Sequence, residues 1–159
     1  MTDLQAIADR LELQALQADF TDAAMNRDWD GFAAVFASDG AWRMPHAKIE
    51  FTSRDAIRAG VEQLRKHWEF FVQTIHPGAL TITGDTATGR TYIEEFGRLQ
   101  DGTSHRNYAR YHDTYRRTPN GWKFTDRTYE ILYYESTPIT GTVPNTTTFF
   151  DLPESARNE

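Results

Sequence analysis

Three long runs of strand-forming residues, set apart by short turn signals, constrain the fold of this chain more than any other feature. The runs are Thr86–Leu99, Thr103–Thr118 and Trp122–Tyr134, and the turn signals before them are Gly84-Asp85, Asp101-Gly102 and Pro119-Asn120-Gly121. Strands joined by such tight turns must be antiparallel neighbours. Strands longer than about 10 residues are unusual, so we expect a strongly curved sheet.

The first half of the chain has the periodicity of helices. Apolar residues from Leu4 to Met25 recur at helical spacing and form one stripe, which we expect to be buried. A second helix is predicted from Asp28, a common N-cap residue type, to Asp39-Gly40. A third is predicted to begin at the capping-box-like Thr52-Ser53-Arg54-Asp55, with a buried stripe of Ile57, Val61, Leu64 and Trp68.

Shorter strands complete the pattern. We expect one at Ala41–Met44, between the second and third helices, and two more at Phe70–Ile75 and Ala79–Thr83. Helices followed by a meander indicate an α+β fold with the helices on one face of the sheet. We therefore predict a cone-shaped, curved antiparallel sheet that wraps over three N-terminal helices.

The composition limits the range of functions. At 159 residues the chain fits one domain, predicted over residues 1–150, with a polar, frayed end at 151–159. It contains no cysteine, which excludes disulfides and thiolate nucleophiles, and its net charge of -6 argues against nucleic-acid binding. No stretch approaches the about 20 apolar residues of a membrane helix, so we expect no membrane span and a cytoplasmic location.

Signatures of cofactor and metal binding are missing from the sequence. The glycines stand singly, so neither a phosphate-binding loop nor a dinucleotide fingerprint occurs. The histidines show no HxH or HExxH spacing, and His105 and His112 fall on opposite faces of one predicted strand. We therefore expect neither a metal site nor a bound cofactor.

Three groups of residues resemble a known family. The groups are Asn26–Phe32 with Asp39–Trp42, Thr74–Gly78 with Gly84–Ala87, and Tyr111–Asp113 with Gly121–Phe124. In this order they resemble the helix–helix–strand start, the central hairpin and the last two strands of SnoaL-like proteins, a branch of the NTF2-like superfamily. The resemblance spans about residues 4–135. It implies a cone with an enclosed small-molecule pocket.

The resemblance also implies a chemistry. Scytalone dehydratase, bile acid 7α-dehydratase and hexachlorocyclohexane dehydrochlorinase belong to this family, and they eliminate across a carbon–carbon bond with a histidine–aspartate pair and no cofactor. Ketosteroid isomerases, polyketide cyclases and non-catalytic dioxygenase β subunits share the fold. Fold alone therefore leaves the activity open.

His76 matches the pocket histidine of the family, and a histidine with a pKa of about 6.5 suits proton transfer at neutral pH. The family aspartate that would orient this histidine aligns with Met25. Asp22 lies one helical turn earlier, inside the predicted buried stripe, so it is the candidate partner of His76. A pairing of Asp22 with Arg127 or Arg43 would make it structural instead.

The predicted pocket wall comes from several elements. Strand alternation puts Asn107 and Tyr111 on one face of the Thr103–Thr118 run, and we expect that face to point inward. The other predicted wall residues are Phe20, Met25, Trp42 and Tyr92. A pocket rich in aromatic residues suits a flat, apolar substrate.

These observations predict a cofactor-independent lyase or isomerase that acts on a hydrophobic, cyclic small molecule, with His76 as acid/base and Asp22 as its orienting partner. The alternatives are a non-catalytic binding or assembly subunit like a dioxygenase β subunit, which the loss of the family aspartate at Met25 favours, and a polyketide cyclase. We also expect a homodimer or other homo-oligomer, formed by the convex sheet face around Tyr108 and Arg110.

Overall fold

The computed structural model describes residues 4–143, and these form three α-helices and six strands. The helices are α1 (Leu4–Asn26), α2 (Trp29–Ala34) and α3 (Arg54–Arg65). The strands are β1 (Phe36–Met44), β2 (Ile49–Thr52), β3 (Trp68–Thr83), β4 (Thr86–Leu99), β5 (Ser104–Thr118) and β6 (Gly121–Glu135), and a short 3-10 turn, η1 (Pro45–Ala47), joins β1 to β2. The predicted end of the domain at residue 150 and the tail at 151–159 lie outside the described residues.

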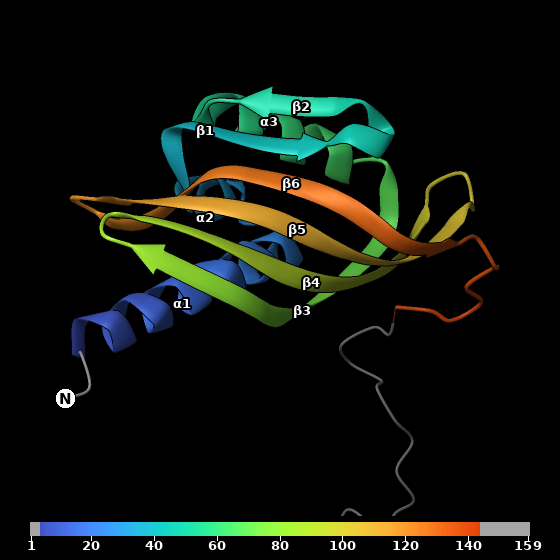
Figure 1. The fold of residues 1–159 in the computed structure, drawn as a ribbon. Coiled ribbons are helices and arrows are strands. Elements are labelled where there is room, and N and C mark those ends of the chain that lie inside the picture. The colour runs from blue at the N-terminus through green and yellow to red at the C-terminus, as the bar shows by residue number, and fades with distance from the viewer. Residues whose placement is uncertain (1–3, 144–159) are drawn as a thin grey trace, which may run out of the picture.

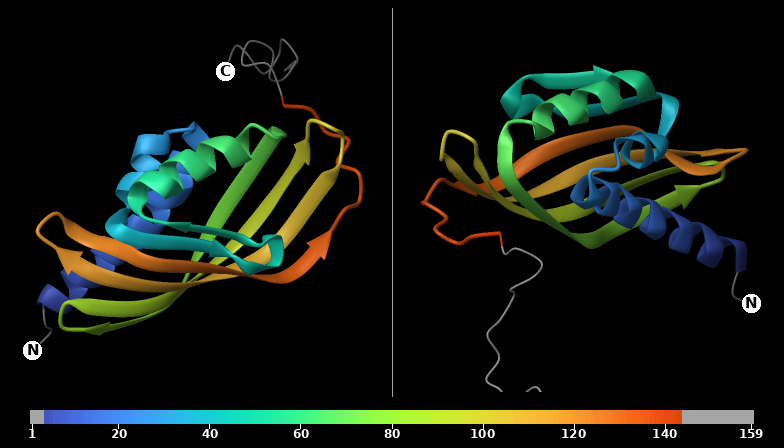
Figure 2. Two further views of the ribbon diagram at one scale, coloured as in Figure 1. Left: turned by 90° about the horizontal axis from the view of Figure 1, so that it is seen from above. Right: turned by 180° about the vertical axis from the view of Figure 1, so that it is seen from behind.

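The strands form one curved sheet in the order β2-β1-β6-β5-β4-β3 (Figure 1). Helices α1, α2 and α3 gather on one face of this sheet, and the strands bend around them (Figure 2). The predicted α+β architecture is therefore confirmed. The sheet is mixed rather than purely antiparallel, because β1 pairs with β6 in parallel. Strand β6 comes to lie beside β1 after the chain has formed β2, α3 and strands β3 to β5, and the two strands run in the same direction.

The long strands and their turns are as predicted. Strands β4, β5 and β6 have 14, 15 and 15 residues, and the turns before and between them place Gly84 and Gly121 at φ values of 58° and 85°. A residue without a Cβ adopts these positive φ values at little cost. Strand β3 runs through the two segments predicted as separate strands, with an irregular register between Pro77 and Leu80.

The end of one helix and the start of one strand differ from expectation. Helix α2 begins after its predicted N-cap Asp28, whose carboxylate accepts a hydrogen bond from the Gly31 amide at 2.9 Å, but it ends at Ala34 rather than at Asp39-Gly40. Strand β1 starts at Phe36, which is fully buried and pairs with Phe124 of β6. Sheet pairing thus overrides local helix propensity there. Helix α3 begins at Arg54, within the predicted capping-box-like segment, and its N-cap is Ser53.

Helix α1 buries a different face from the one predicted. Leu4 and Leu11 are 79% and 60% exposed, whereas Leu13, Leu16 and Phe20 are buried. The buried face also carries three polar residues, namely Asp9, Gln17 and Thr21. These residues are tolerated because each finds a partner; the Gln17 amide, for example, donates to the Tyr115 hydroxyl at 2.7 Å. The face predicted from apolar residues alone is therefore rotated about the helix axis relative to the face that is buried in the structure.

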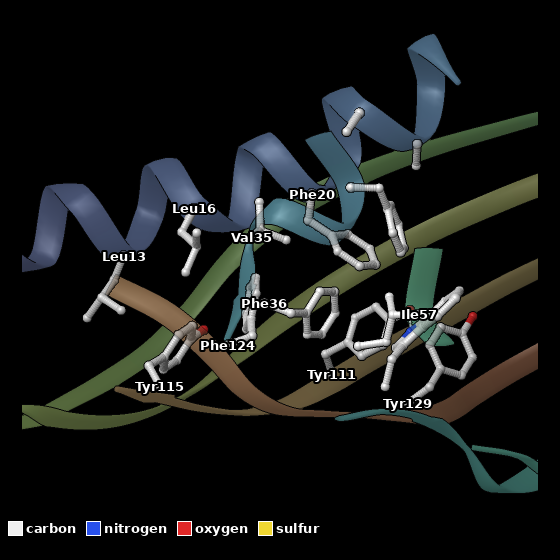
Figure 3. Close-up of a cluster of buried hydrophobic side chains, with 14 of the residues drawn as sticks. Leu13, Leu16, Phe20, Val35, Phe36, Ile57, Tyr111, Tyr115, Phe124 and Tyr129 are labelled. Atoms are coloured by element: carbon white, nitrogen blue, oxygen red, sulfur yellow. Dashed lines mark hydrogen bonds between the residues drawn. The ribbon is translucent and has the colours of Figure 1, made fainter. Parts of the chain in front are cut away.

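Aromatic rings fill the core between α1 and the inner face of the sheet (Figure 3). The Phe20 ring lies at the centre, 5.6 Å from the Tyr111 ring and 4.4 Å from the Phe32 ring, measured between centroids. Tilted and edge-to-face contacts of this kind add to the stabilisation from apolar burial. None of the helices within residues 4–143 is long and apolar enough to span a membrane.

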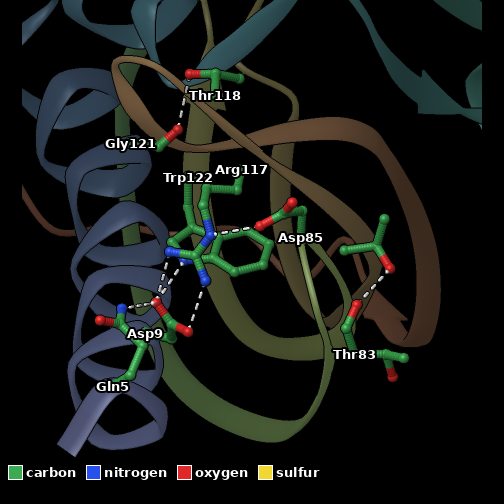
Figure 4. A network of polar contacts seen from close by, with 9 residues as sticks. Gln5, Asp9, Thr83, Asp85, Arg117, Thr118, Gly121 and Trp122 are labelled. Atoms are coloured by element: carbon green, nitrogen blue, oxygen red, sulfur yellow. Dashed lines mark hydrogen bonds and ion pairs between the residues drawn. The ribbon is translucent and has the colours of Figure 1, made fainter.

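A polar cluster fixes the first half of α1 to the β5–β6 hairpin (Figure 4). The carboxylate of Asp9 accepts two hydrogen bonds from Arg117, both at 2.7 Å, and one from the indole of Trp122 at 3.2 Å. Arg117 also stacks on the Trp122 ring and donates to Asp85 at 2.9 Å. These contacts join the first half of α1 to β5, β6 and the turn before β4.

Candidate active site

A cavity of about 560 Å³ opens between the helices and the inner face of the sheet. Helices α1, α2 and α3, strands β1 and β2 and turn η1 line one side, and strands β3 to β6 line the other. Most of the wall is aromatic or aliphatic, and the rings of Phe20, Phe32 and Trp42 form its inner end. A cavity of this size and character suits a ring-sized apolar molecule.

Polar groups converge on the sheet side of this cavity. Glu95 of β4 is opposite Gln73 of β3 and Asn107 of β5 in the strand register, so the three side chains lie in one row on the inner face. Glu95 points inward because it follows the buried Ile93 by two residues along β4. The alternation of the strand thus places a carboxyl group in an apolar wall.

Hydrogen bonds hold both oxygens of this carboxyl group. The Tyr129 hydroxyl donates to Oε2 of Glu95 at 2.5 Å, and the Gln73 amide donates to Oε1 at 2.6 Å. Gln73 is held in turn by Thr21 of α1, whose hydroxyl donates to its side-chain oxygen at 2.7 Å. The carboxyl group is therefore fixed in position by neighbours from two strands and, through Gln73, by the first helix.

The protonation of Glu95 reflects its burial. Loss of contact with water raises the pKa of the Glu95 carboxyl above its ordinary value of 4.5, although the hydrogen bonds from its polar neighbours act in the opposite direction. The Tyr129 phenol also has a raised pKa, mainly because of burial, and so remains a donor. Glu95 therefore has the character of a group that exchanges a proton at a pH nearer neutrality than an exposed glutamate does.

A second donor stands on the neighbouring strand. The hydroxyl of Tyr111 accepts a hydrogen bond from the Trp42 indole at 3.1 Å, and within residues 4–143 no acceptor takes its own proton. Burial raises the pKa of the Tyr111 phenol, so it keeps that proton. Because Tyr111 lines the cavity, this proton is available to an oxygen atom of a ligand.

A buried ion pair supports the inner end of the cavity. Arg127 is fully buried, lies 3.1 Å from Asp113 between Nε and Oδ1, and is stacked between the Phe20 and Tyr111 rings at 4.1 Å from each centroid. Asp113 also accepts a hydrogen bond from Thr91 at 2.9 Å. Neither charged residue lines the cavity, so this pair supports the aromatic wall rather than contacting a ligand.

Three basic side chains also line the cavity. His46 of η1 packs against the Tyr129 ring, and burial lowers its pKa, which favours the neutral imidazole. His105 of β5 contacts the Tyr134 hydroxyl through Nδ1 at 2.9 Å. Arg65, the last residue of α3, is the third. Among the described residues no three potential ligands converge in a geometry that could hold a metal ion.

Four of the residues predicted from sequence meet in this cavity. Phe20, Trp42, Asn107 and Tyr111 all line it. The inward face of β5 was derived from strand alternation, and it is confirmed by the burial of Ala109, Tyr111 and Asp113. Met25 instead lines a neighbouring hollow, where its sulfur atom lies 3.1 Å from the backbone nitrogen of Gln73.

The structure places His76 and Tyr92 outside the cavity. They are opposite each other on β3 and β4, on the outer face of the sheet, and Tyr92 is 37% exposed. The reason is strand parity, because Gln73 and Ile75 face inward on β3 and His76 must therefore face outward. The placement expected for Tyr92 in the wall is corrected accordingly, and an acid/base role for His76 stays a prediction.

The structure also separates Asp22 from the cavity. It is exposed on α1 rather than buried, because the buried face of the helix is rotated from the predicted one. Its carboxylate accepts a hydrogen bond from Asn26 at 3.1 Å. Arg127 and Arg43, its other candidate partners, pair with Asp113 and with Glu50 instead. A catalytic role for Asp22 stays a prediction without a contact to support it.

Sequence reasoning missed the polar centre of the site. Glu95 carried a usable signal, because an acidic residue two positions after Ile93 in a long strand must share its inward face. Gln73 carried the same signal relative to Ile75. Tyr129 and Arg65 carried none, since aromatic residues of β6 and basic residues at helix ends are common on surfaces as well.

Comparisons with known proteins agree on the fold. A family model described as a SnoaL-like domain matches residues 5–128. A protein from Novosphingobium aromaticivorans provisionally named an aromatic ring hydroxylase is 27% identical, with a TM-score of 0.76 over 82% of this chain and 94% of its own. A search of curated protein sequences finds no match.

Two further solved structures show the same fold at lower identity. The hexachlorocyclohexane dehydrochlorinase LinA-type3 from Novosphingobium barchaimii is 23% identical, with a TM-score of 0.80 over 91% of this chain and 100% of its own. A protein from Novosphingobium aromaticivorans provisionally named scytalone dehydratase is 18% identical, with a TM-score of 0.74 over 91% and 97%.

Proposed function

The chain belongs to the SnoaL-like domain family, and from this premise we propose that it is a lyase or isomerase that uses Glu95 to move a proton on a hydrophobic, cyclic small molecule. The observation that carries the proposal is the buried carboxyl group of Glu95 in an apolar cavity, held by Tyr129 and Gln73. A base of this kind needs no cofactor.

In a carbonyl substrate the first step is removal of a proton from the carbon atom next to the carbonyl group; in a halogenated ring without a carbonyl group, the electron pair of the broken C–H bond would form the double bond directly as the halide leaves. The C–H bond breaks, its proton passes to Glu95, and its electron pair moves toward the carbonyl to form an enolate-like oxygen. Tyr111 lines the same cavity with an available proton and would stabilise that oxygen. Asn107, beside Glu95 in the strand register, is a second candidate donor.

The second step decides between the two reaction types. In an elimination the electron pair forms a carbon–carbon double bond, and a hydroxide or halide leaves from the neighbouring carbon. In an isomerisation Glu95 returns the proton to a different carbon of the same molecule. A leaving hydroxide requires a proton, which the protonated Glu95 can supply as water departs.

Substrate classes are suggested by the relatives. The names of two proteins with the same fold refer to hexachlorocyclohexane and to scytalone, and a third name refers to an aromatic ring. Ring compounds of this kind fit a cavity of about 560 Å³ with an aromatic wall. These names support a cyclic substrate and leave its identity open.

The proposal is tested by turnover of three probes. Hexachlorocyclohexane reports elimination through chloride release, 4-hydroxy-2-tetralone reports dehydration through its ultraviolet spectrum, and 3-cyclohexenone reports isomerisation to the conjugated ketone. Wild type is expected to turn over at least one probe, and Glu95→Gln is expected to lower that rate by about 100-fold or more. Turnover that survives in Glu95→Gln would reject Glu95 as the proton-transfer group.

A second candidate function is a non-catalytic ligand-binding subunit. A specific observation favours it: Met25, which stands at the position of the family aspartate, contacts Gln73 rather than a histidine. His76, which matches the family histidine, stands three residues after Gln73 on the opposite face of β3, so it does not form the family pair with position 25. Tight binding of ring compounds without turnover of any probe would favour this candidate.

We propose in addition that the protein works as a cytoplasmic homodimer. The outer face of β4 to β6 exposes large aromatic side chains, among them Tyr92, Tyr108 and Tyr133, which are 37%, 44% and 53% exposed. Such a surface on a curved sheet suits pairing with a second copy through a two-fold axis. Sedimentation analysis of wild type and Tyr108→Lys tests the dimer, and a monomeric wild type would reject it.

A further inference from the structure

Arg65 differs from the other charged residues of the cavity in having no hydrogen-bond or ion-pair partner within residues 4–143. It is the last residue of α3, and its side chain lines the cavity beside Phe71. Its Nε and Nη1 atoms are buried, and within residues 4–143 no hydrogen-bond acceptor contacts them. By contrast, Arg58 on the same helix bonds to Asp30 and lies 3.1 Å from Glu62.

The surroundings of Arg65 do not compensate for the missing hydrogen bonds of its guanidinium group. Burial and the positive charge of Arg27 lower the pKa of the Arg65 guanidinium to about 10, so it remains charged at neutral pH. Glu69 lines the adjoining hollow with Arg65, but Arg98 holds both of its oxygens, at 2.6 and 2.7 Å. The Phe71 ring, 5.2 Å from the guanidinium carbon, is its one described stabilising neighbour.

We propose that Arg65 binds the carboxylate of the ligand, so that the cavity selects apolar ring compounds that carry a carboxylate. This inference rests on the proposed function for the location of the ligand and narrows its substrate class. The guanidinium presents parallel N–H donors that match the two oxygens of a carboxylate. Binding would thus satisfy the buried nitrogen atoms that the protein itself leaves unpaired.

The geometry divides the cavity into two functional ends. Arg65 stands where α3 meets the start of β3, and Glu95 stands on β4 with its partners Gln73 and Tyr129. A ligand anchored by its carboxylate at Arg65 extends its apolar body along the aromatic wall toward Glu95.

The experiment compares matched acids and neutral amides by isothermal titration calorimetry on the full chain. The probes are 2-naphthoate against 2-naphthamide and 4-biphenylcarboxylate against its amide, so that each pair keeps the ring system and the planar head group while the amide lacks the negative charge. Wild type is expected to bind at least one acid about tenfold or more tightly than its amide, as a charge-assisted hydrogen-bond pair would give. Equal affinities, or no binding of either acid, would overturn the proposal.

Two variants test whether the preference for acids over amides depends on Arg65. Arg65→Met keeps the apolar stem and removes the charge, so it is expected to bind acid and amide equally while keeping the affinity for the amide. Arg58→Met makes the same change on the same helix and is expected to keep the wild-type preference. A preference that persists in Arg65→Met would overturn the assignment, as would its loss in Arg58→Met.

A third variant separates this inference from the proposed function. Glu95→Gln is expected to keep the acid preference while losing turnover, because the carboxylate is held at Arg65. Failure of the proposed function would appear as turnover that survives in Glu95→Gln, with the calorimetric preference unchanged. Failure of the present inference would appear as equal affinities for acid and amide, whatever the turnover.

Discussion

The hydroxyl oxygen of Tyr129 lies 2.5 Å from Oε2 of Glu95, and both residues line the cavity. A hydrogen bond this short between a phenol and a carboxyl group gives Glu95 a fixed orientation in an otherwise apolar wall. It also stabilises the carboxylate form against the desolvation that raises the pKa of Glu95. Among the described residues, Glu95 is the one carboxyl group that lines the cavity. The strand register of β4 places it there, and Tyr129 of β6 holds it.

Removal of the Tyr129 hydroxyl is the most selective change to this contact. Tyr129→Phe keeps the ring and its packing on Tyr111, so the fold is expected to persist. Without the hydrogen bond the carboxylate loses stabilisation, and the pKa of Glu95 is expected to rise further. Carbon-13 NMR of the labelled glutamate carboxyl groups, followed over a pH titration, measures the change; an unchanged or lower pKa would contradict it.

Glu95 makes folding depend on pH in a defined direction. Because its pKa is raised in the folded protein above the 4.5 of the unfolded chain, the folded state retains a proton that the unfolded state has lost. This contribution to stability is complete below pH 4.5 and is lost as the pH rises through the folded pKa. The free energy of unfolding of wild type, relative to that of Glu95→Gln, should therefore fall over this window in urea titrations. A difference that stays constant with pH would contradict the raised pKa.

Disruption of the buried ion pair should destabilise the fold strongly. Asp113→Asn leaves the guanidinium of Arg127 buried without a counter-charge, and the expected loss is about 3–5 kcal/mol of unfolding free energy. The double variant Asp113→Asn with Arg127→Met removes the unpaired charge and should recover part of the lost unfolding free energy. Urea denaturation measures both, and a double variant less stable than the single one would show that the charge is not the cause.

The Asp9–Arg117 contact should stabilise the protein above acidic pH. The Arg117 guanidinium holds the pKa of the Asp9 carboxyl well below its usual 3.8. Such a contribution is complete above the unfolded pKa and is lost as the pH falls through the folded one. Asp9→Asn should therefore have a lower melting temperature than wild type at pH 7 and pH 5. The difference in melting temperature should become smaller below pH 3.8. Asp22→Asn, an exposed change on the same helix, serves as the control and should have the same melting temperature as wild type.

Much of the architecture could be predicted because it depends on local signals. The turn glycines Gly84 and Gly121 and the cap Asp28 act within a few residues, and the structure has them where the sequence indicated. The pairing of β1 with β6 could not be predicted, because residues 36–44 and 121–135 are brought together only by the tertiary fold. For the same reason α2 stops at Ala34.

The site was harder to predict than the fold because it depends on which face of each element is buried. Strand alternation placed Asn107 and Tyr111 correctly, since a strand has only two faces. Helix α1 offers many more orientations, and its buried Gln17 and Thr21 make its true inner face look polar. The rotation of this one helix accounts for the exposed position of Asp22.

The contrast between His76 and Glu95 supplies a further prediction. His76 is exposed on the outer face of the sheet, whereas Glu95 lines the cavity. His76→Ala is therefore expected to keep turnover of any accepted probe within about threefold of wild type, far from the about 100-fold that loss of a general base costs. Steady-state kinetics measures this, and a loss comparable to that of Glu95→Gln would restore His76 as a catalytic candidate.

The most direct test of the central claim is proton exchange at carbon, which requires neither a leaving group nor the natural substrate. 2-Tetralone is incubated in D₂O with wild type, Glu95→Gln and His76→Ala, and proton NMR follows the loss of the signal from the carbon next to the carbonyl group. The account predicts that wild type accelerates exchange over buffer, that His76→Ala does the same, and that Glu95→Gln falls by about 100-fold or more. Equal exchange by wild type and Glu95→Gln would contradict it, because the cavity would then move protons without its buried carboxyl group.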